Sequence, residues 1–141
     1  MIDNIFFQHN IERKSNAAAK TFAKHDFIHH HCRNDLIERM TFMNLNPKIA
    51  IDLGCANGSS SRFLAKHYKK CHTFSLDLSQ GMLIESRKKR SFLTPIMEIQ
   101  ASAYSLPFKN NSIDLIFANL LMPWIGDLPL FFIEISRILK N

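Results

Sequence analysis

The stretch spanning residues 49–58 constrains the fold of this 141-residue chain more than any other. An apolar run ends in Asp52, a short turn bounded by Gly54 and Gly58 follows, and residues 59–68 then show helical spacing of apolar side chains. Strand, tight turn and helix in this order form the first βα corner of a doubly wound sheet, where ligands bind. Glycine permits the backbone angles that such a turn needs and lets a ligand approach the main chain. A purely structural strand-to-helix corner would show the same pattern, so the turn alone does not decide between the two.

A second acidic residue supports the ligand-binding interpretation. Residues 71–76 are expected to form the next strand, and Asp77 follows it, 23 residues after Gly54. An acid at the end of the second strand, about 20 residues beyond the glycine turn, can accept hydrogen bonds from both hydroxyls of a ribose. A solvated loop aspartate is the alternative for Asp77, but its spacing favours an adenosine-binding site.

Four segments together resemble the class I S-adenosylmethionine-dependent methyltransferases. They are residues 52–58 (DLGCANG), 76–83 (LDLSQGML), 106–108 (LPF) and 112–116 (SIDLI). A fifth segment, residues 119–128 (NLLMPWIGDL), resembles the BioC-like branch of that family, which contains the malonyl-acyl-carrier-protein methyltransferases of biotin synthesis. The same branch includes the arginine hydroxylase of mitochondrial complex I assembly. The resemblance covers roughly residues 18–140, and the set of motifs is far more specific than any single member.

The resemblance implies an α/β fold, with a Rossmann-like, doubly wound and mostly parallel sheet preceded by lid helices. Sheets of this type carry about six or seven strands, whereas about four can be placed in this sequence. We therefore expect a single, partial S-adenosylmethionine-dependent methyltransferase domain over residues 1–141, corresponding to the N-terminal half to two-thirds of the fold and truncated at the C-terminus. Residues 1–45 are the expected N-terminal helical lid segment.

Hydrophobic periodicity predicts the order of the elements. Residues 1–16 are polar and expected to be loosely ordered, whereas a helical pattern begins at Ala17 and is expected to break near residue 34. Helices are expected at residues 59–68, from Ser79 to the basic residues at 87–90, and at 128–139, where Phe131, Phe132, Ile135, Ile138 and Leu139 face the core. Strands are expected at residues 48–53, 71–76, 96–100 and 113–118.

The resemblance also implies which residues bind the cofactor, S-adenosyl-L-methionine. Two of them depart from the usual pattern, because relatives generally have Gly at the position of Ala56 and Asp at that of Ser102. Met82 is expected either to pack on the adenine ring or to be an ordinary core methionine. The full expected set is Asp52, Gly54, Cys55, Ala56, Gly58, Asp77, Leu78, Met82, Ser102, Ala103 and Asn119.

The expected chemistry requires no particular catalytic side chain. The methyl group of a sulfonium is already activated, so positioning of the reactants does most of the work. We identify no catalytic residue and expect no metal site, because the consecutive side chains of residues 29–32 (HHHC) cannot converge on one ion from a helix. Trp124 is expected beside the cofactor mouth or, equally, in the core.

The expected function is S-adenosylmethionine-dependent methyl transfer, with the carboxylate of a malonyl-acyl-carrier protein as the acceptor implied by the resemblance. Two alternatives remain open. The first is a cofactor-binding remnant or assembly factor without transfer activity, and the second is an arginine hydroxylase of the complex I assembly type. The mass of the product distinguishes methylation from hydroxylation.

Charge and composition bound the partners. The formal net charge is +6, and the main basic runs, residues 69–70 and 87–90, fall near expected helix C-termini, where cations are favoured. Solvated helix ends are therefore favoured over a docking patch. The resemblance implies an acidic acyl carrier protein or a small carboxylate as substrate, and we expect neither a nucleic-acid nor a membrane partner. The exposed edge of the strand at residues 113–118 would also allow the chain to form a homo-oligomer.

The cysteines and the hydrophobic segments indicate the compartment. Three cysteines without regular spacing are typical of a reducing compartment, so we expect a cytoplasmic protein. The most apolar region, residues 113–135, is interrupted by acidic residues and prolines that a lipid-facing helix would not tolerate.

Overall fold

The computed structural model describes residues 2–141 and the side chains from residue 5 onward. Its centre is a parallel four-stranded sheet in the order β3-β2-β1-β4, which confirms the expected α/β fold. The strands are β1 (Ile49–Leu53), β2 (His72–Asp77), β3 (Ile96–Gln100) and β4 (Leu115–Phe117). The helices are α1 (Ile2–Ala18), α2 (Phe22–His25), α3 (Phe27–Thr41), α4 (Ser59–His67), α5 (Gln80–Lys88), the short 3-10 helix η1 (Met122–Trp124) and α6 (Leu128–Ile138).

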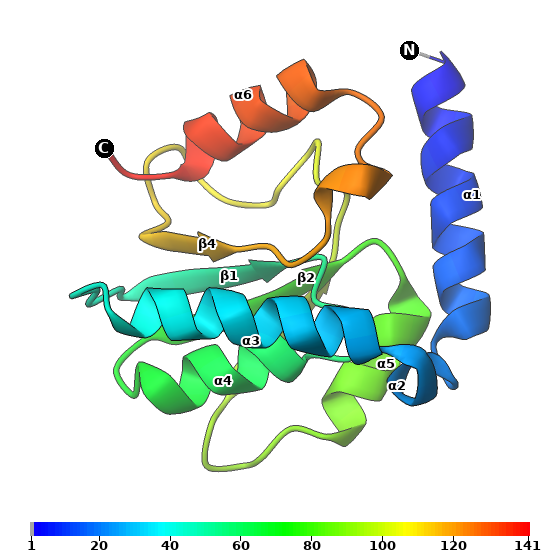
Figure 1. Cartoon of the computed structure of the whole chain (residues 1–141). Helices are drawn as coiled ribbons and strands as arrows, with labels where there is room; N and C mark the ends of the chain where they lie inside the picture. Colours follow the sequence, from blue (N-terminus) through cyan, green and yellow to red (C-terminus); the bar gives the residue numbers. More distant parts are fainter. Residues whose placement is uncertain (1) are drawn as a thin grey trace.

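Helices cover both faces of the sheet (Figure 1). Helices α3, α4 and α5 lie on one side and α6 on the other, while α1 stands across the carboxyl ends of the strands. The core between sheet and helices is formed by apolar side chains that the sequence pattern places inward, among them Ile51, Leu53, Leu76, Ile113 and Phe131. Because β1 lies between β2 and β4, its carboxyl end is flanked on both sides by strand ends.

The expectation that residues 1–16 are loosely ordered is wrong, because α1 extends over Ile2–Ala18; Met1 lies outside the described residues. Polar contacts from distant parts of the chain hold this helix. The side-chain oxygen of Asn16 accepts hydrogen bonds from the Ser79 hydroxyl and the Gly81 amide, both at 2.7 Å. The expected break near residue 34 is also wrong, because α3 continues through Asn34, whose side chain bonds to His30 one turn earlier.

The last strand and the last helix differ in detail from the expectation. Strand β4 is restricted to three residues, because Ile113 pairs with the segment after α6, where its amide donates to the Ile138 carbonyl at 2.9 Å. In α6, Phe131 and Ile138 are buried as expected, but Phe132 is half exposed, so its expected inward position is wrong. Residues 131, 135 and 138 share one helical face, and residue 132 is turned about 100° away from it.

Across residues 2–141, no helix combines the length and the apolar character needed to cross a bilayer.

Candidate functional site

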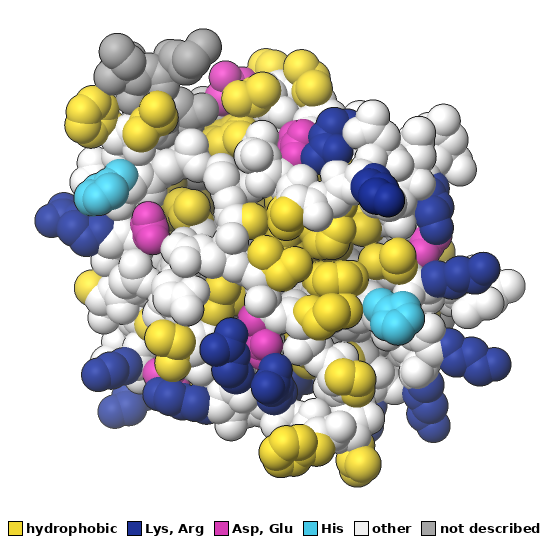
Figure 2. Space-filling view, turned by 180° about the vertical axis from the view of Figure 1, so that it is seen from behind, with side chains coloured by type: hydrophobic (Ala, Val, Ile, Leu, Met, Phe, Trp, Pro, Cys, Tyr) yellow, Lys and Arg dark blue, Asp and Glu magenta, His cyan; other side chains and the backbone are white. Residues whose placement is uncertain are grey.

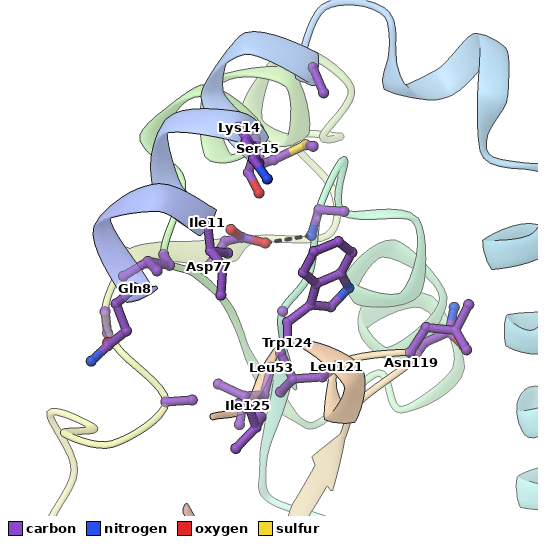
Figure 3. A pocket seen from close by; sticks show the side chains of 18 of the residues that line it. Gln8, Ile11, Lys14, Ser15, Leu53, Asp77, Asn119, Leu121, Trp124 and Ile125 are labelled. Atoms are coloured by element: carbon purple, nitrogen blue, oxygen red, sulfur yellow. Dashed lines mark hydrogen bonds between the residues drawn. The ribbon is translucent and has the colours of Figure 1, made fainter. Parts of the chain in front are cut away.

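A cavity of about 270 Å³ lies at the carboxyl ends of the strands, between α1 and the segment around η1 (Figure 3). Its wall brings together seven of the eleven residues expected at the cofactor site. Open α/β sheets bind ligands at this edge, where the strand order reverses. The seven residues are Gly54, Ala56, Asp77, Leu78, Met82, Ala103 and Asn119.

The glycine turn presents its main chain to the cavity. Gly54 has a φ of +72°, and its amide donates to the Leu76 carbonyl of the neighbouring strand at 2.8 Å. A Cβ atom at Gly54 would lie 2.9 Å from the Leu121 side chain, so a larger residue would disturb the wall. Ala56 follows with a φ of +47°, a left-handed conformation that is unfavourable for residues other than glycine. Gly54 therefore adopts the positive φ expected from the sequence, whereas the same region of φ is conformationally strained at Ala56.

Asp77 connects the end of β2 to this turn. One carboxylate oxygen accepts a hydrogen bond from the Ala56 amide at 2.9 Å, drawn as a dashed line in Figure 3, and the other accepts from the Ser79 amide at 2.8 Å. Burial raises the pKa of Asp77, while these amides act in the opposite direction. A carboxylate offers about four acceptor positions, so the two amides leave capacity for the hydroxyl groups of a ligand.

Asn119 follows β4 and supplies an acceptor that lacks a partner. Its side-chain nitrogen donates to the His29 carbonyl at 2.9 Å, which orients the amide group. Its Oδ1 is buried and has no hydrogen-bond partner among the described residues. Buried acceptors are almost always paired, so this oxygen is an exception in a residue that lines the cavity.

Helix α1, within the expected lid segment, provides cavity-lining residues that the sequence analysis did not name. Gln8, Ile11, Lys14 and Ser15 all line the cavity, and Trp124 and Ile125 belong to the same lining. Figure 3 shows Ile11 and Trp124 reaching toward the central space from α1 and η1. Ile11, Ser15 and Ala18 share one helical face, the only periodic signal that could have predicted this helix. Trp124 is 53% exposed, so the core alternative for this residue is wrong.

Four expected site residues lie outside the cavity wall. Cys55 is buried, and burial raises the pKa of its thiol well above the usual value, which makes it a packing residue rather than a reactive one. Gly58 has a φ of +73° at the start of α4, and any Cβ there would clash with Ser86. The Ser102 hydroxyl donates to the Gln8 side chain at 2.5 Å and so contacts α1.

Asp52 is the fourth of these residues and lies inside the protein. It is 1% exposed, and its carboxylate accepts a hydrogen bond from the Ser61 hydroxyl at 2.6 Å. Ser61 in turn accepts from Ser75 at 2.6 Å. Burial raises the pKa of Asp52 to about 7. Asp52 therefore connects β1 to α4 and, through Ser61, to β2 behind the glycine turn.

The site shows no arrangement typical of acid–base or metal catalysis. The Tyr104 hydroxyl accepts a hydrogen bond from the Asp127 amide at 3.0 Å, and His29 packs edge-on against Phe22. Among the described side chains, from residue 5 onward, the structure contains no group of three His, Cys, Asp or Glu residues that could hold a metal ion. The cavity can therefore bind and orient a ligand, with Lys14 and Asp77 as its two charged lining residues.

Comparisons with known proteins agree with this geometry. Residues 51–141 match the family model described as "Methyltransferase domain". The chain is 29% identical over 140 residues to a malonyl-[acyl-carrier protein] O-methyltransferase of Xylella fastidiosa, in an alignment covering 99% of this chain and 48% of that protein. It is also 29% identical to the mitochondrial arginine-hydroxylase NDUFAF5 of Homo sapiens, covering 97% of this chain and 39% of that protein.

Among solved structures, phosphoethanolamine N-methyltransferase 1 of Haemonchus contortus, in complex with phosphoethanolamine and S-adenosylhomocysteine, has a TM-score of 0.76. At 19% identity, with 95% of this chain and 29% of that one covered, this likeness shows the fold. The chain spans 48% of the Xylella fastidiosa methyltransferase and 39% of the human arginine-hydroxylase, which is about half or less of the length of these relatives.

Proposed function

The chain belongs to the methyltransferase-domain family, and from this premise we propose that it binds S-adenosylmethionine in the cavity beneath α1 and takes part in methyl transfer. When bound, this cofactor supplies a methyl group that its sulfonium already activates. The observation that carries the proposal is that the Asp77 residue at the end of β2 and the glycine turn at Gly54 and Ala56 line one cavity. The proposal includes a cytoplasmic location, which the three free cysteines support.

The residues of the cavity fit such a ligand. Asp77 would accept hydrogen bonds from the ribose hydroxyls, as expected for an acid at this position. Asn119 Oδ1 would accept from the ammonium group, the one strong donor at the amino-acid end of the cofactor. Met82 and its apolar neighbours Leu78 and Ala103 would contact the adenine ring. Lys14 would be available to the carboxylate.

The protein's own contribution to the reaction is positioning. The glycine turn and Asp77 hold one end of the ligand, and α1 and Trp124 cover the cavity and reduce the access of water. Methyl transfer to a carboxylate needs no general base, because the acceptor is already an anion at neutral pH.

We further propose that the acceptor of the methyl group is anionic. A groove next to the cavity runs between α1 and η1, and it shares Ile11, Lys14 and Trp124 with the cavity wall. Its charged lining residues are the cations Arg13 and Lys14. Such a lining favours a carboxylate on an acidic carrier, and the relative from Xylella fastidiosa is named for methylation of malonyl-acyl-carrier protein. We therefore propose the carboxylate of malonyl-acyl-carrier protein as the methyl acceptor.

Two measurements test the parts separately. Calorimetry with S-adenosylhomocysteine tests the cofactor site, and absence of binding would refute it. Mass spectrometry of malonyl-acyl-carrier protein incubated with the chain and cofactor tests the acceptor, with a gain of one methyl group as the expected product. The rate should fall with added salt, since attraction between opposite charges is screened. Cofactor binding without methyl transfer would refute malonyl-acyl-carrier protein as the acceptor and would support the cofactor site. Addition of an oxygen atom to an arginine would favour the activity named for the human relative.

A further inference from the structure

The edge of the sheet opposite the cavity carries three loops that share an unusual composition. All four strands are parallel, so the segments that lead into β1, β2 and β3 meet at the same edge. These segments are residues 42–48, 68–71 and 89–95, which follow the C-termini of α3, α4 and α5. We call this surface the amino-edge face. It lies at the starts of the strands, whereas the cavity lies at their carboxyl ends.

Large apolar side chains project from the amino-edge face. Phe92 is 105% exposed and Leu93 is 91% exposed, at the tip of the loop between α5 and β3. Phe42 and Met43, directly after α3, are 84% and 58% exposed. Figure 2 shows hydrophobic side chains projecting at the lower end of the molecule, with Lys and Arg side chains on either side. Side chains of this kind at the tips of neighbouring loops mark an interaction surface.

The same three loops and the helix ends that precede them are rich in cations. Half of the eighteen Lys and Arg residues of the chain lie in the three loops or in the last helical turns that precede them. Glu98 pairs with Arg90 at 3.0 Å and with Arg87 at 3.7 Å, and Glu85 pairs with Lys88 at 2.7 Å. The other cations form no ion pair among the described residues. The whole set is Arg39, Lys48, Lys66, Lys69, Lys70, Arg87, Lys88, Lys89 and Arg90.

Favourable placement at helix C-termini accounts for some of these cations but not for the apolar side chains. Phe92 and Leu93 gain nothing from a helix dipole, and their exposure is unfavourable in water unless a partner covers them. A partner that fits must offer an apolar interior beneath an anionic surface. A membrane containing anionic lipids has this combination, because apolar side chains enter the headgroup boundary while Lys and Arg contact phosphate.

We propose that the amino-edge face docks the protein on an anionic membrane surface, with Phe92 and Leu93 inserted between the lipid headgroups and Lys69, Lys70 and Lys89 contacting phosphates. This geometry keeps the cavity, at the opposite edge, open to solutes in the aqueous phase. The separation also argues against a substrate carrier as the occupant, because a carrier must reach the cavity. Phe92 and Leu93 lie on the β3 side of the sheet, whereas β4 forms the other edge. The proposal replaces the expectation that the protein has no membrane partner.

Sedimentation with lipid vesicles tests the proposal. The chain should pellet with vesicles that contain phosphatidylglycerol and not with vesicles of pure phosphatidylcholine, and added salt should release it. Replacing Lys69, Lys70 and Lys89 by Ala should weaken binding by about fivefold per residue. Phe92→Ser combined with Leu93→Ser should weaken it by at least about tenfold. The matched control, Phe27→Ser, removes another exposed aromatic side chain, 74% exposed and outside the amino-edge face, and should leave binding unchanged.

Fluorescence separates insertion from simple electrostatic attraction. Trp124, the one tryptophan of the chain, lies at the cavity and should not be quenched by brominated lipids in the wild-type chain. In the variant Phe92→Trp, quenching and a blue shift should appear with anionic vesicles. Equal binding to neutral and anionic vesicles, unchanged binding of the Phe92→Ser/Leu93→Ser variant, or affinity for RNA with none for vesicles would each overturn the proposal.

Discussion

Replacement of Asp77 by Asn gives the sharpest test of the cofactor site. The carboxylate of Asp77 accepts the Ala56 amide with one oxygen and the Ser79 amide with the other. Asn keeps the size of the side chain but replaces one acceptor oxygen by a donor group. One of the two backbone amides then faces a donor, and the negative charge available to a ligand is lost. Ala would remove both acceptors at once, so Asn separates binding from folding more cleanly.

The expected magnitudes follow from these contacts. A buried amide left without an acceptor costs about 1–3 kcal/mol, which is the expected loss in the free energy of unfolding. A hydrogen bond to a charged acceptor contributes about 1.5–3 kcal/mol, so loss of even one bond to a ribose hydroxyl lowers affinity by about tenfold or more. The affinity should therefore fall even under conditions in which the variant is fully folded.

Urea unfolding and calorimetry with S-adenosylhomocysteine measure the two effects separately. Asp114→Asn is the matched control, because the Asp114 carboxylate accepts the amides of Lys48 and Ile49 at 3.0 and 2.8 Å at the opposite edge of the sheet. It also pairs with Lys140 at 2.7 Å, so this variant should lose stability and keep its affinity. Wild-type affinity in a folded Asp77→Asn variant would refute the assignment of Asp77 to the ribose.

Three further predictions concern stability and association. The folded-state pKa of Asp52 is raised to about 7, so this group destabilises the folded protein by up to about 4 kcal/mol as pH rises from about 4 to about 7. Urea unfolding should show a weaker decline over this range in Asp52→Asn; an unchanged decline would contradict the prediction. Ala56→Gly should raise the free energy of unfolding by up to about 1 kcal/mol. Relief of the left-handed conformation contributes about 1–2 kcal/mol, and the greater entropy of the unfolded glycine chain offsets about 0.5–1 kcal/mol of it. A fall in the free energy of unfolding would show that Ala56 is not strained. The chain should self-associate through the free edge of β4 and the exposed face of α6. Ile133→Lys should reduce the molecular mass measured by light scattering. A monomeric wild-type chain would refute the predicted self-association.

The sheet and the glycine turn could be predicted because local sequence determines them. The apolar runs of β1, β2 and β3 and the residues of the turn are contiguous, and the bounds of these three strands differ from the expected ones by at most one residue at each end. The Ser79 hydroxyl accepts the Met82 amide, as expected for a helix cap. The spacing between Gly54 and Asp77 likewise predicted that both would meet at one edge, and both line the cavity.

The position of Asp52 could not be derived from the motif alone. Successive residues of a strand point to opposite faces, so Asp52 and Leu53 cannot both face the same neighbours. The structure turns Asp52 toward Ser61 of α4, and Leu53 lines the cavity instead. A motif shows that an acid is placed near the turn, but the strand's orientation decides whether it contacts a ligand or supports the turn from behind.

The contacts that attach helix α1 could not be predicted, because they are single polar pairs distant in sequence. Asn16 bonds to Ser79 and Gly81 at the start of α5, while Glu12 accepts from Gln100 at 3.0 Å. Net contributions of such bonds are about 0.5–1.5 kcal/mol each, far less than the apolar burial that holds the sheet. Separating α1 from the cavity therefore costs much less than opening the core.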